Sequence, residues 1–379
     1  MAVIPYMSTG IFDHGAISQL AKTLKKLRGA RPFIVTDPGI KAAGLLDKVL
    51  EQLDEAPAGV FADTLPNPEE AQAEIATTAY KESGADSIIG LGGGSSLDMS
   101  KMVGLMATHE GPYDQYGTAE RGTRLIKALP PLIAVPTTSG TGSEVSAGFM
   151  VTMKSGRKEL FVSPRAMPAT AICDPDLTFG LPPHLTAATG MDAVTHCIES
   201  IISPSANPVA DAIGLDGVAR AVGQGMLKRA TEDGSDPDAR WNMMLASYEG
   251  ALAFVKGLGA VHSLSHGAGR LTDLRPHHGT LNAIWLPHVL RFNADAPNME
   301  EPYARIRTAM GLPAGADLGD AIAELNEDLG IPAGLKALGF DASRGAGVVK
   351  WAMKDLATFT NPKPLEQADF EALYEAAMV

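Results

Sequence analysis

Cysteine is scarce in this sequence of 379 residues, which contains only Cys173 and Cys197. Two thiols cannot build a disulfide framework, and their scarcity favours a reducing, cytoplasmic compartment. Long apolar runs are missing as well: none reaches the roughly 18 residues of a membrane-spanning helix, so we expect no membrane partner. The first ten residues, MAVIPYMSTG, lack a basic segment followed by an apolar core, and we therefore expect no secretory signal.

Lysine and arginine are also fewer than aspartate and glutamate. The chain has 31 Lys and Arg against 44 Asp and Glu, a net charge of −13. This balance works against nucleic acid as a partner, because its phosphates would be repelled. An anionic cofactor must then be held locally, by backbone amides and helix ends. With 45% hydrophobic and 20% charged residues, the composition is that of a globular protein.

The hydrophobic pattern, and with it the predicted secondary structure, changes near the middle of the chain. Short β-rich runs alternate with helical stretches from about residue 15 to 180, which predicts an α/β domain with a parallel sheet. Long amphipathic stretches follow and predict an all-α domain. We place the boundary in the Gly/Pro-containing connector Phe179–Pro183, which gives an N-terminal domain of residues 1–180 and a C-terminal domain of residues 181–379.

A glycine run follows one of the predicted buried strands. The apolar run Ser87–Leu91 ends in Gly92–Ser95, and a helix is predicted from about Leu97. Glycines let the backbone approach a ligand closely, and the helix start offers free amides to phosphate. The run is not GxGxxG, and many tight turns need glycine. The order of strand, glycines and helix nevertheless predicts a phosphate site and a dinucleotide-binding domain.

Two further features belong to the same domain. The loop Thr137–Ser143 follows the strand Leu132–Val135 with hydroxyls and amides, but no Lys follows its glycines, so it is not a P-loop. In open α/β sheets, ligands bind at the carboxyl ends of strands, where both loops fall. Asp37 follows the strand Pro32–Val35, and an acid there favours NAD over NADP, since it accepts ribose hydroxyls and repels a 2′-phosphate. A helix N-cap is the alternative role for Asp37.

Four of the nine histidines fall within Ala260–Gly279. His262 and His266 are four residues apart and share one face of a predicted helix. His277 and His278 follow a polar loop. This density indicates a metal site in the C-terminal domain.

Asp192 and His196 offer a second acid and imidazole pair at helical spacing. Two such pairs and one loop histidine provide five donors, whereas a tetrahedral metal site takes four. We therefore expect one of the five to lie next to the ligands or to face the substrate. The set is not HExxH, because Thr195 precedes His196, and the chain has no GxSxG elbow, which argues against peptide hydrolysis and acyl transfer. A metal that polarises an oxygen beside a nicotinamide favours an alcohol or aldehyde oxidoreductase.

These motifs resemble the iron-containing (group III) alcohol dehydrogenases over nearly the whole length of the chain. That family joins an N-terminal dinucleotide domain to a C-terminal helical domain. The matching segments are Leu65–Pro68, Gly90–Ser95 with Asp98 and Lys101, Pro136–Glu144, Gly190–His196, His262 with His266, and His278–His288.

The resemblance implies roles residue by residue. The metal ligands, for Fe²⁺ or sometimes Zn²⁺, would be Asp192, His196, His262 and His278. His266 matches a histidine near substrate and nicotinamide, a candidate for proton relay, and Lys158 a basic residue near the nicotinamide ribose; these two are the candidate catalytic residues. The NAD contacts would be Asp37, Gly93, Gly94, Ser95, Asp98, Thr137, Thr138, Ser143, Lys158 and Leu177.

Two features depart from the family's pattern. The gap before His278 is slightly long, and the extra His277 leaves the last ligand ambiguous; we choose His278 because it directly precedes the match that begins at Gly279. Lys256 lies close in sequence to His262. It either extends its stem over the surface or binds a substrate anion.

The sequence therefore predicts a metal-dependent NAD(H) alcohol dehydrogenase or aldehyde reductase for a small alcohol or aldehyde, acting as a homodimer or higher homo-oligomer. One alternative is a reductase of a short anionic substrate, of the maleylacetate or 4-hydroxybutyrate type. Others are a lyase resembling dehydroquinate synthase and a non-catalytic NAD-binding protein.

Overall fold

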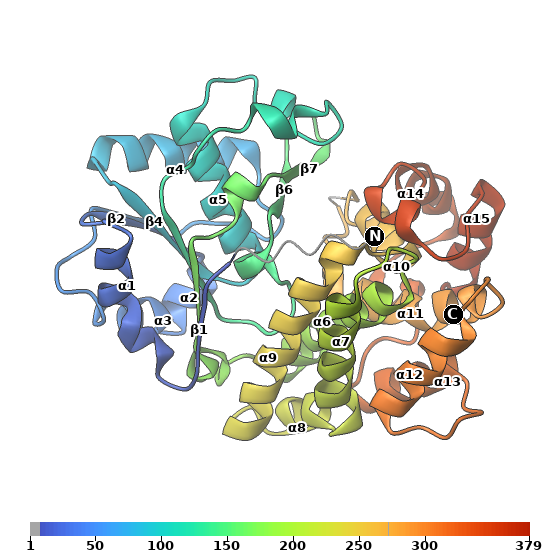
Figure 1. Ribbon diagram of the computed structural model, residues 1–379. Coiled ribbons are helices and arrows are strands. Elements are labelled where there is room, and N and C mark those ends of the chain that lie inside the picture. The colour runs from blue at the N-terminus through green and yellow to red at the C-terminus, as the bar shows by residue number, and fades with distance from the viewer. Residues whose placement is uncertain (1–7, 272) are drawn as a thin grey trace. The chain divides into compact units, whose positions relative to one another are not determined.

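The computed structural model describes residues 8–271 and 273–379. The chain divides into two compact units, and it passes from one to the other at Gly180 and Leu181 (Figure 1). Each unit has hydrophobic core residues of its own.

The N-terminal unit contains a six-stranded parallel sheet in the order β1-β8-β5-β4-β2-β3. Its strands are β1 (Gly10–Phe12), β2 (Pro32–Val35), β3 (Gly59–Phe61), β4 (Ser87–Gly92), β5 (Leu132–Pro136) and β8 (Thr170–Cys173). The central strands β2, β4 and β5 are buried along their whole length, as expected for parallel strands covered on both faces. The predicted parallel sheet is confirmed.

Helices cover both faces of this sheet: α1 (Leu20–Lys26), α2 (Pro38–Ala42), α3 (Leu45–Leu50), α4 (Glu70–Ser83) and α5 (Gly94–Thr108). Successive strand residues point to opposite faces, so Ile88 packs in the core under α4 and α5, while Ile89 packs in the core under α1 and α3 (Figure 1). The short helices are η1 (Ala16–Gln19), η2 (Tyr113–Tyr116), η3 (Gly122–Leu125), η4 (Ser143–Val145), η5 (Pro164–Ala166) and η6 (Pro175–Thr178).

An antiparallel hairpin of β6 (Gly148–Thr152) and β7 (Lys158–Val162) adds a second, smaller sheet. The alternation of strands and helices in the sequence does not predict it. Lys101 anchors the hairpin from α5, because its fully buried Nζ donates to the carbonyls of Ser146 and Gly148 at 2.9 and 2.8 Å.

The C-terminal unit is all-helical over its described residues, which confirms the predicted class. The α-helices are α6 (Pro183–Ile202), α7 (Pro208–Val218), α8 (Met226–Glu232), α9 (Pro237–Ala253), α10 (Ala260–Ala268), α11 (His278–Asn293), α12 (Glu300–Met310), α13 (Leu318–Asp328), α14 (Gly345–Ala352) and α15 (Gln367–Ala376). A π-helix, η7 (Ala219–Gly223), and the 3-10 helices η8 (Phe254–Lys256), η9 (Leu335–Leu338), η10 (Ala342–Arg344) and η11 (Leu356–Thr360) complete it. No helix among residues 8–271 and 273–379 is both long and apolar enough to cross a membrane.

Helix α6 lies at the centre of this unit and packs against α7, α9 and α11. The start of α11 comes so close to α6 that a Cβ added at Gly279 would lie 2.0 Å from the carbonyl oxygen of Ala188. A side chain at Gly279 is therefore excluded unless the helices move apart. This close approach also brings the first residue of α11, His278, to the middle of α6.

We expect Gly279→Ala to destabilise the helical unit by about 1 to 3 kcal/mol, the usual cost of overpacking a tight contact. Gly347→Ala is the control, since Gly347 is an exposed position of α14 with no atom within 4 Å of an added Cβ. That change should be neutral or stabilise by about 0.5 to 1 kcal/mol. Urea denaturation of the metal-free variants measures both effects, and equal midpoints would contradict the packing argument.

Candidate functional site

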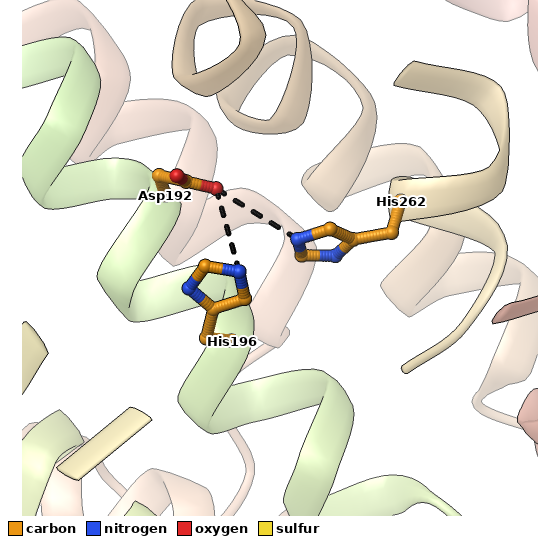
Figure 2. Close-up of side chains that lie close together, drawn as sticks. All are labelled: Asp192, His196 and His262. Atoms are coloured by element: carbon orange, nitrogen blue, oxygen red, sulfur yellow. Dashed lines mark ion pairs between the residues drawn. The ribbon is translucent and has the colours of Figure 1, made fainter. Parts of the chain in front are cut away.

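Three donors from two helices converge inside the C-terminal unit. Asp192 and His196 lie one turn apart on α6, and His262 lies on α10 (Figure 2). The Oδ1 atom of Asp192 is 3.8 Å from Nε2 of His196 and 3.7 Å from Nε2 of His262. All three side chains are buried, and their ligand atoms lie within 4.8 Å of one another.

Between the two neighbouring histidines, His278 is the one that faces this group. Its Nε2 lies 3.6 Å from Oδ1 of Asp192. His277 precedes α11 as its N-cap residue, and it is exposed. The side chain of His278 is 34% exposed, whereas that of Asp192 is 5% exposed, so His278 marks the side from which solvent reaches the group.

The arrangement fits a divalent cation. Two ligands at about 2.0 to 2.2 Å in a tetrahedral shell are roughly 3.4 Å apart, close to the three observed distances of 3.6 to 3.8 Å from the Asp192 oxygen. One carboxylate and three imidazoles are a donor set that suits Fe²⁺ or Zn²⁺. Asp192, His196 and His262 converge, and His278 approaches them through the Asp192 oxygen.

The electrostatics of the group agree with this interpretation. Burial alone would raise the pKa of Asp192, but the nearby His196, His278 and His262 outweigh it and hold that pKa well below its usual range. Burial alone would lower the pKa of His262, yet the adjacent carboxylates of Asp192 and Glu199 raise it to about 9. Without a cation, His262 therefore holds an extra proton, which a bound metal would displace.

Glu199 is a functional candidate that the sequence analysis missed. Its side chain is completely buried, and its Oε2 accepts from Nδ1 of His262 at 2.6 Å, while Oε1 accepts from the backbone amide of Val261 at 2.8 Å. The first contact holds a proton on Nδ1, so Nε2, the atom that faces Asp192, would be the donor to a metal. A sequence signal existed, because Glu199 lies three residues after His196 on the same helix.

Asn282 is a second residue that the sequence analysis missed. It is fully buried on α11, one turn after His278. Its Nδ2 donates to Oδ1 of Asp192 at 2.7 Å and lies 3.3 and 3.2 Å from Nε2 of His262 and of His278. The amide thus holds the Asp192 carboxylate toward the centre of the group.

His266 lies beside the group without joining it. Its ring stacks on that of His278 with centroids 5.3 Å apart, and its Nδ1 contacts Oδ2 of Asp355 at 2.9 Å. Burial alone would raise the pKa of Asp355, but His266 lowers it. An ionised Asp355 keeps the proton of His266 on Nδ1 and orients Nε2 outward. Asp355 is 89 residues from His266, and no sequence pattern pointed to it.

In the N-terminal unit, the two predicted cofactor loops pack against each other. Gly92 has φ 139°, Gly93 is the N-cap residue of α5, and Gly94 begins that helix. A Cβ at Gly94 would lie 2.9 Å from the side chain of Thr141, and one at Gly93 would lie 3.4 Å from that of Thr138. Larger residues here would push the second loop away from the helix start.

The position of Asp37 is compatible with both of its predicted roles, the cofactor contact and the helix N-cap. Its Oδ1 accepts from the backbone amide of Ile40 at 3.0 Å and caps α2, which is the alternative role. Its Oδ2 accepts from Oγ of Ser96 at 2.8 Å, so the carboxylate also lies beside the glycine loop. Contact with a ribose remains a prediction for Asp37.

Lys158 joins the glycine loop through a residue that was not singled out. Its Nζ donates to Oδ1 of Asn67 at 2.8 Å, and the amide of Asn67 donates to Oγ of Ser95 at 3.3 Å. Asn67 has φ 58°, a left-handed conformation that asparagine tolerates. The three side chains therefore lie together at the end of β4, although the sequence separates them widely.

Among the other predicted cofactor residues, Thr137, Ser143 and Leu177 are buried, and Asp98 is half-buried. Both oxygens of Asp98 accept protein hydrogen bonds, from Oγ of Ser143 at 2.6 Å and from the amide of Met150 at 2.9 Å. Asp98 thus fixes the second loop to the hairpin. Leu177 packs in the core beneath the sheet, and Thr137 is buried at the end of β5.

Comparisons with known proteins agree with this geometry. The model of iron-containing alcohol dehydrogenases matches residues 8–175, and the model of the family's C-terminal domain matches residues 186–378. The chain belongs to the iron-containing alcohol dehydrogenase family. The predicted class of enzyme, an oxidoreductase that acts on CH–OH groups, is thereby confirmed, and the family implies NAD(H) and a divalent metal.

Individual relatives of this alcohol dehydrogenase match over the whole chain. A 4-hydroxybutyrate dehydrogenase of Cupriavidus necator is 47% identical, and the match covers 100% of both sequences. A crystal structure of 1,3-propanediol oxidoreductase is 35% identical with a TM-score of 0.92 and 100% coverage of both chains. The sulfoacetaldehyde reductase of Bifidobacterium kashiwanohense, in complex with NAD⁺, is 26% identical with a TM-score of 0.88, covering 100% of this chain and 98% of the other.

The structure excludes both of the roles that the sequence left open for Lys256 in this dehydrogenase. The Nζ of Lys256 lies 2.5 Å from Oδ1 of Asp211 and donates to the carbonyl of Ile201 at 3.0 Å. Its side chain is only 5% exposed. Lys256 therefore neither extends over the surface nor binds substrate, and it ties η8 to the ends of α6 and α7.

We expect Glu199→Gln to lower metal affinity by about 10- to 100-fold, because the amide cannot hold the His262 proton as the carboxylate does. The control is Glu249→Gln. Burial and the neighbouring Asp216 raise the pKa of Glu249 to about 9, and its Oε2 lies 3.6 Å from Nε of Arg220, so the same replacement there should leave metal affinity unchanged. Competition with a chromophoric chelator for Co²⁺ or Zn²⁺ measures both variants, and equal affinities would contradict the role of Glu199.

The neighbouring histidines provide another test. We expect His278→Ala to release the metal, since it removes a donor 3.6 Å from the Asp192 oxygen. His277→Ala should retain it. Elemental analysis of the dialysed proteins gives the answer, and metal loss in the His277 variant alone would reverse the assignment.

Proposed function

We propose that this chain is a metal-dependent NAD(H) dehydrogenase that interconverts 4-hydroxybutyrate and its semialdehyde. The observation that carries the dehydrogenase activity is the buried group of Asp192, His196 and His262, with His278 Nε2 3.6 Å from the Asp192 oxygen. The full-length similarity to a relative named 4-hydroxybutyrate dehydrogenase supports the substrate. No feature of the described residues favours the lyase or the non-catalytic alternative.

Some residues of the chain would bind and orient the cation, and another would transfer a proton. The four ligands hold the cation, and Glu199 and Asn282 keep His262 and Asp192 oriented toward it. When bound, the cation supplies a Lewis acid for the hydroxyl oxygen and NAD⁺ supplies the hydride acceptor. His266 exchanges the proton at Nε2, because Asp355 holds Nδ1.

The cofactor loops explain how an acidic protein binds a dinucleotide. The amides at the start of α5 and the glycines Gly93 and Gly94 would hold the pyrophosphate. Ser95 would belong to the same pyrophosphate loop, and Lys158 would lie near the nicotinamide ribose. Thr137, Thr138 and Ser143 would form the second cofactor loop, and Leu177 would supply an apolar contact. Asp37 lies beside the glycine loop and would favour NAD over NADP.

The remaining properties follow from the same assignment. Fe²⁺ is the proposed metal, with Zn²⁺ as the alternative, because both suit one carboxylate and three imidazoles. We further propose a cytoplasmic homodimer or higher homo-oligomer. Two buried free cysteines, Cys173 and Cys197, agree with a reducing compartment.

Enzyme activity decides the proposal directly. The Fe²⁺-loaded protein should produce NADH from NAD⁺ and 4-hydroxybutyrate. Chelation of the metal should lower this activity about tenfold or more, and added Fe²⁺ should restore it. NADP⁺ should be the poorer cofactor. Product formation without net change in NADH would indicate the lyase instead, and activity that survives complete metal removal would contradict the metal's role.

A further inference from the structure

The proposed preference for NAD over NADP depends on the carboxylate of Asp37 and on what holds that carboxylate in place. This inference rests on the proposed function, and it concerns a residue that the cofactor assignments leave out, Ser96. Ser96 lies in the first turn of α5, and its side chain is completely buried. A buried hydroxyl needs a hydrogen-bond partner, and the partner of this one is Asp37.

The strands of the sheet bring Asp37 to the glycine loop. Strands β2 and β4 are parallel neighbours, and Val35 is paired with Gly90 in their register. Asp37 and Gly92 each follow these paired residues by two positions, so they come side by side at the carboxyl end of the sheet. A Cβ added at Gly92 would lie 3.0 Å from Oδ2 of Asp37 and 2.8 Å from Cβ of Ser96. The glycine at position 92 therefore leaves the space in which Ser96 reaches Asp37.

Asp37 is held through both of its carboxylate oxygens. Oδ1 accepts from the backbone amide of Ile40 at 3.0 Å, which ties the carboxylate to α2. Oδ2 accepts from Oγ of Ser96 at 2.8 Å, which ties it to α5, 59 residues further along the chain. The last torsion of an aspartate side chain is soft, so a single hydrogen bond would let the carboxylate turn. Two bonds from two helices fix its plane.

These two bonds leave the negative charge of Asp37 in place. Both donors are neutral, a backbone amide and a hydroxyl, so they orient the carboxylate without cancelling its charge. The side chain is half-buried rather than enclosed. Each carboxylate oxygen has two lone pairs, so each keeps one for a further donor such as a ribose hydroxyl. A 2′-phosphate at the same place would meet a fixed negative charge and be repelled.

Ser96 also fixes Asp37 relative to the loop that would hold the pyrophosphate. It directly follows the residues Gly93–Ser95 of that loop. In a dinucleotide the adenosine ribose is attached to the pyrophosphate, so the acid that recognises the ribose must keep its place beside this loop. The hydrogen bond from Ser96 provides the link, because it joins the acid that follows β2 to the helix that begins in the loop.

We propose that Ser96 is a positioning residue for cofactor choice: its hydroxyl holds the Asp37 carboxylate beside the glycine loop and thereby makes the protein select NAD(H) over NADP(H). Without this hydroxyl, Asp37 keeps only its bond to Ile40. The carboxylate can then turn away from a 2′-phosphate, and it must be ordered again when a ribose binds. Loss of the hydroxyl therefore weakens the binding of NADH and relieves the repulsion of NADPH.

The test measures the Kd of NADH and of NADPH for the metal-loaded protein from the fluorescence of the reduced nicotinamide. Ser96→Ala should lower the ratio of the Kd for NADPH to that for NADH by about three- to tenfold, a part of the roughly 10- to 100-fold that a charged hydrogen bond contributes. Ser100→Ala is the matched control. Ser100 lies one turn later on α5, is also buried, and donates to the carbonyl of Leu97 instead, so the ratio should stay within about twofold.

A double-mutant cycle separates the positioning of the charge from packing. Asp37→Asn keeps a good helix N-cap and an acceptor for Ser96, but it removes the charge that repels a 2′-phosphate. In this background Ser96→Ala should change the ratio by less than about twofold, because no charge is left to position. An equal effect of Ser96→Ala with and without the Asp37 charge would overturn the proposal.

Ser96→Cys covers the case in which the alanine variant does not fold. It fills a similar space with a thiol, which is a weaker donor, so a lower ratio of the two Kd values supports the proposal. An unchanged or higher ratio in the Ser96 variants that fold overturns it. So does a native protein that binds NADPH as tightly as NADH, which would leave the dehydrogenase activity intact. A native protein that binds neither dinucleotide would instead overturn the proposed function and the inference with it.

Discussion

The helical unit is organised around a buried carboxylate that has no lysine or arginine at its side. Asp192 is almost fully enclosed, and an isolated charge at such a position is costly. Three imidazole nitrogens within 3.6 to 3.8 Å and the amide of Asn282 compensate for it. The same contacts gather the imidazoles of His196, His262 and His278 around the Asp192 oxygen. The stability of the buried carboxylate and the capacity to bind a metal therefore depend on the same side chains.

The backbone must bring three helices together to make this possible. Helix α6 supplies two ligands at helical spacing, but α10 and α11 each supply one, and their approach is set by small residues. Gly279 lets α11 touch α6, and Gly267 lets α10 touch α14. The second contact lies beside the pair of His266 and Asp355, whose residues are 89 positions apart in the chain. The geometry of the site therefore depends on the two glycines that allow these helix contacts as well as on the ligands themselves.

What the sequence predicted depended on whether a signal was local. The parallel sheet and the helical unit follow from alternating runs and from amphipathic periods, and both are confirmed by the structure. The candidate ligands on α6 and α10, which are Asp192, His196 and His262, were predicted from spacing and resemblance, and Glu199 was within reach of the same reasoning. Asp355 was not, because 89 residues separate it from His266. The hairpin of β6 and β7 was missed for a similar reason, since Lys101 anchors it from a helix 45 and 47 residues away.

Lys256 shows why proximity in sequence is a poor guide to substrate contact. It lies six residues before His262, yet its ammonium is paired with Asp211 inside the fold, where a substrate would have to displace a buried ion pair. Breaking such a pair leaves an uncompensated buried charge and costs about 3 to 5 kcal/mol. Lys256 therefore holds η8 against α6 and α7, although its place in the sequence suggested a substrate contact.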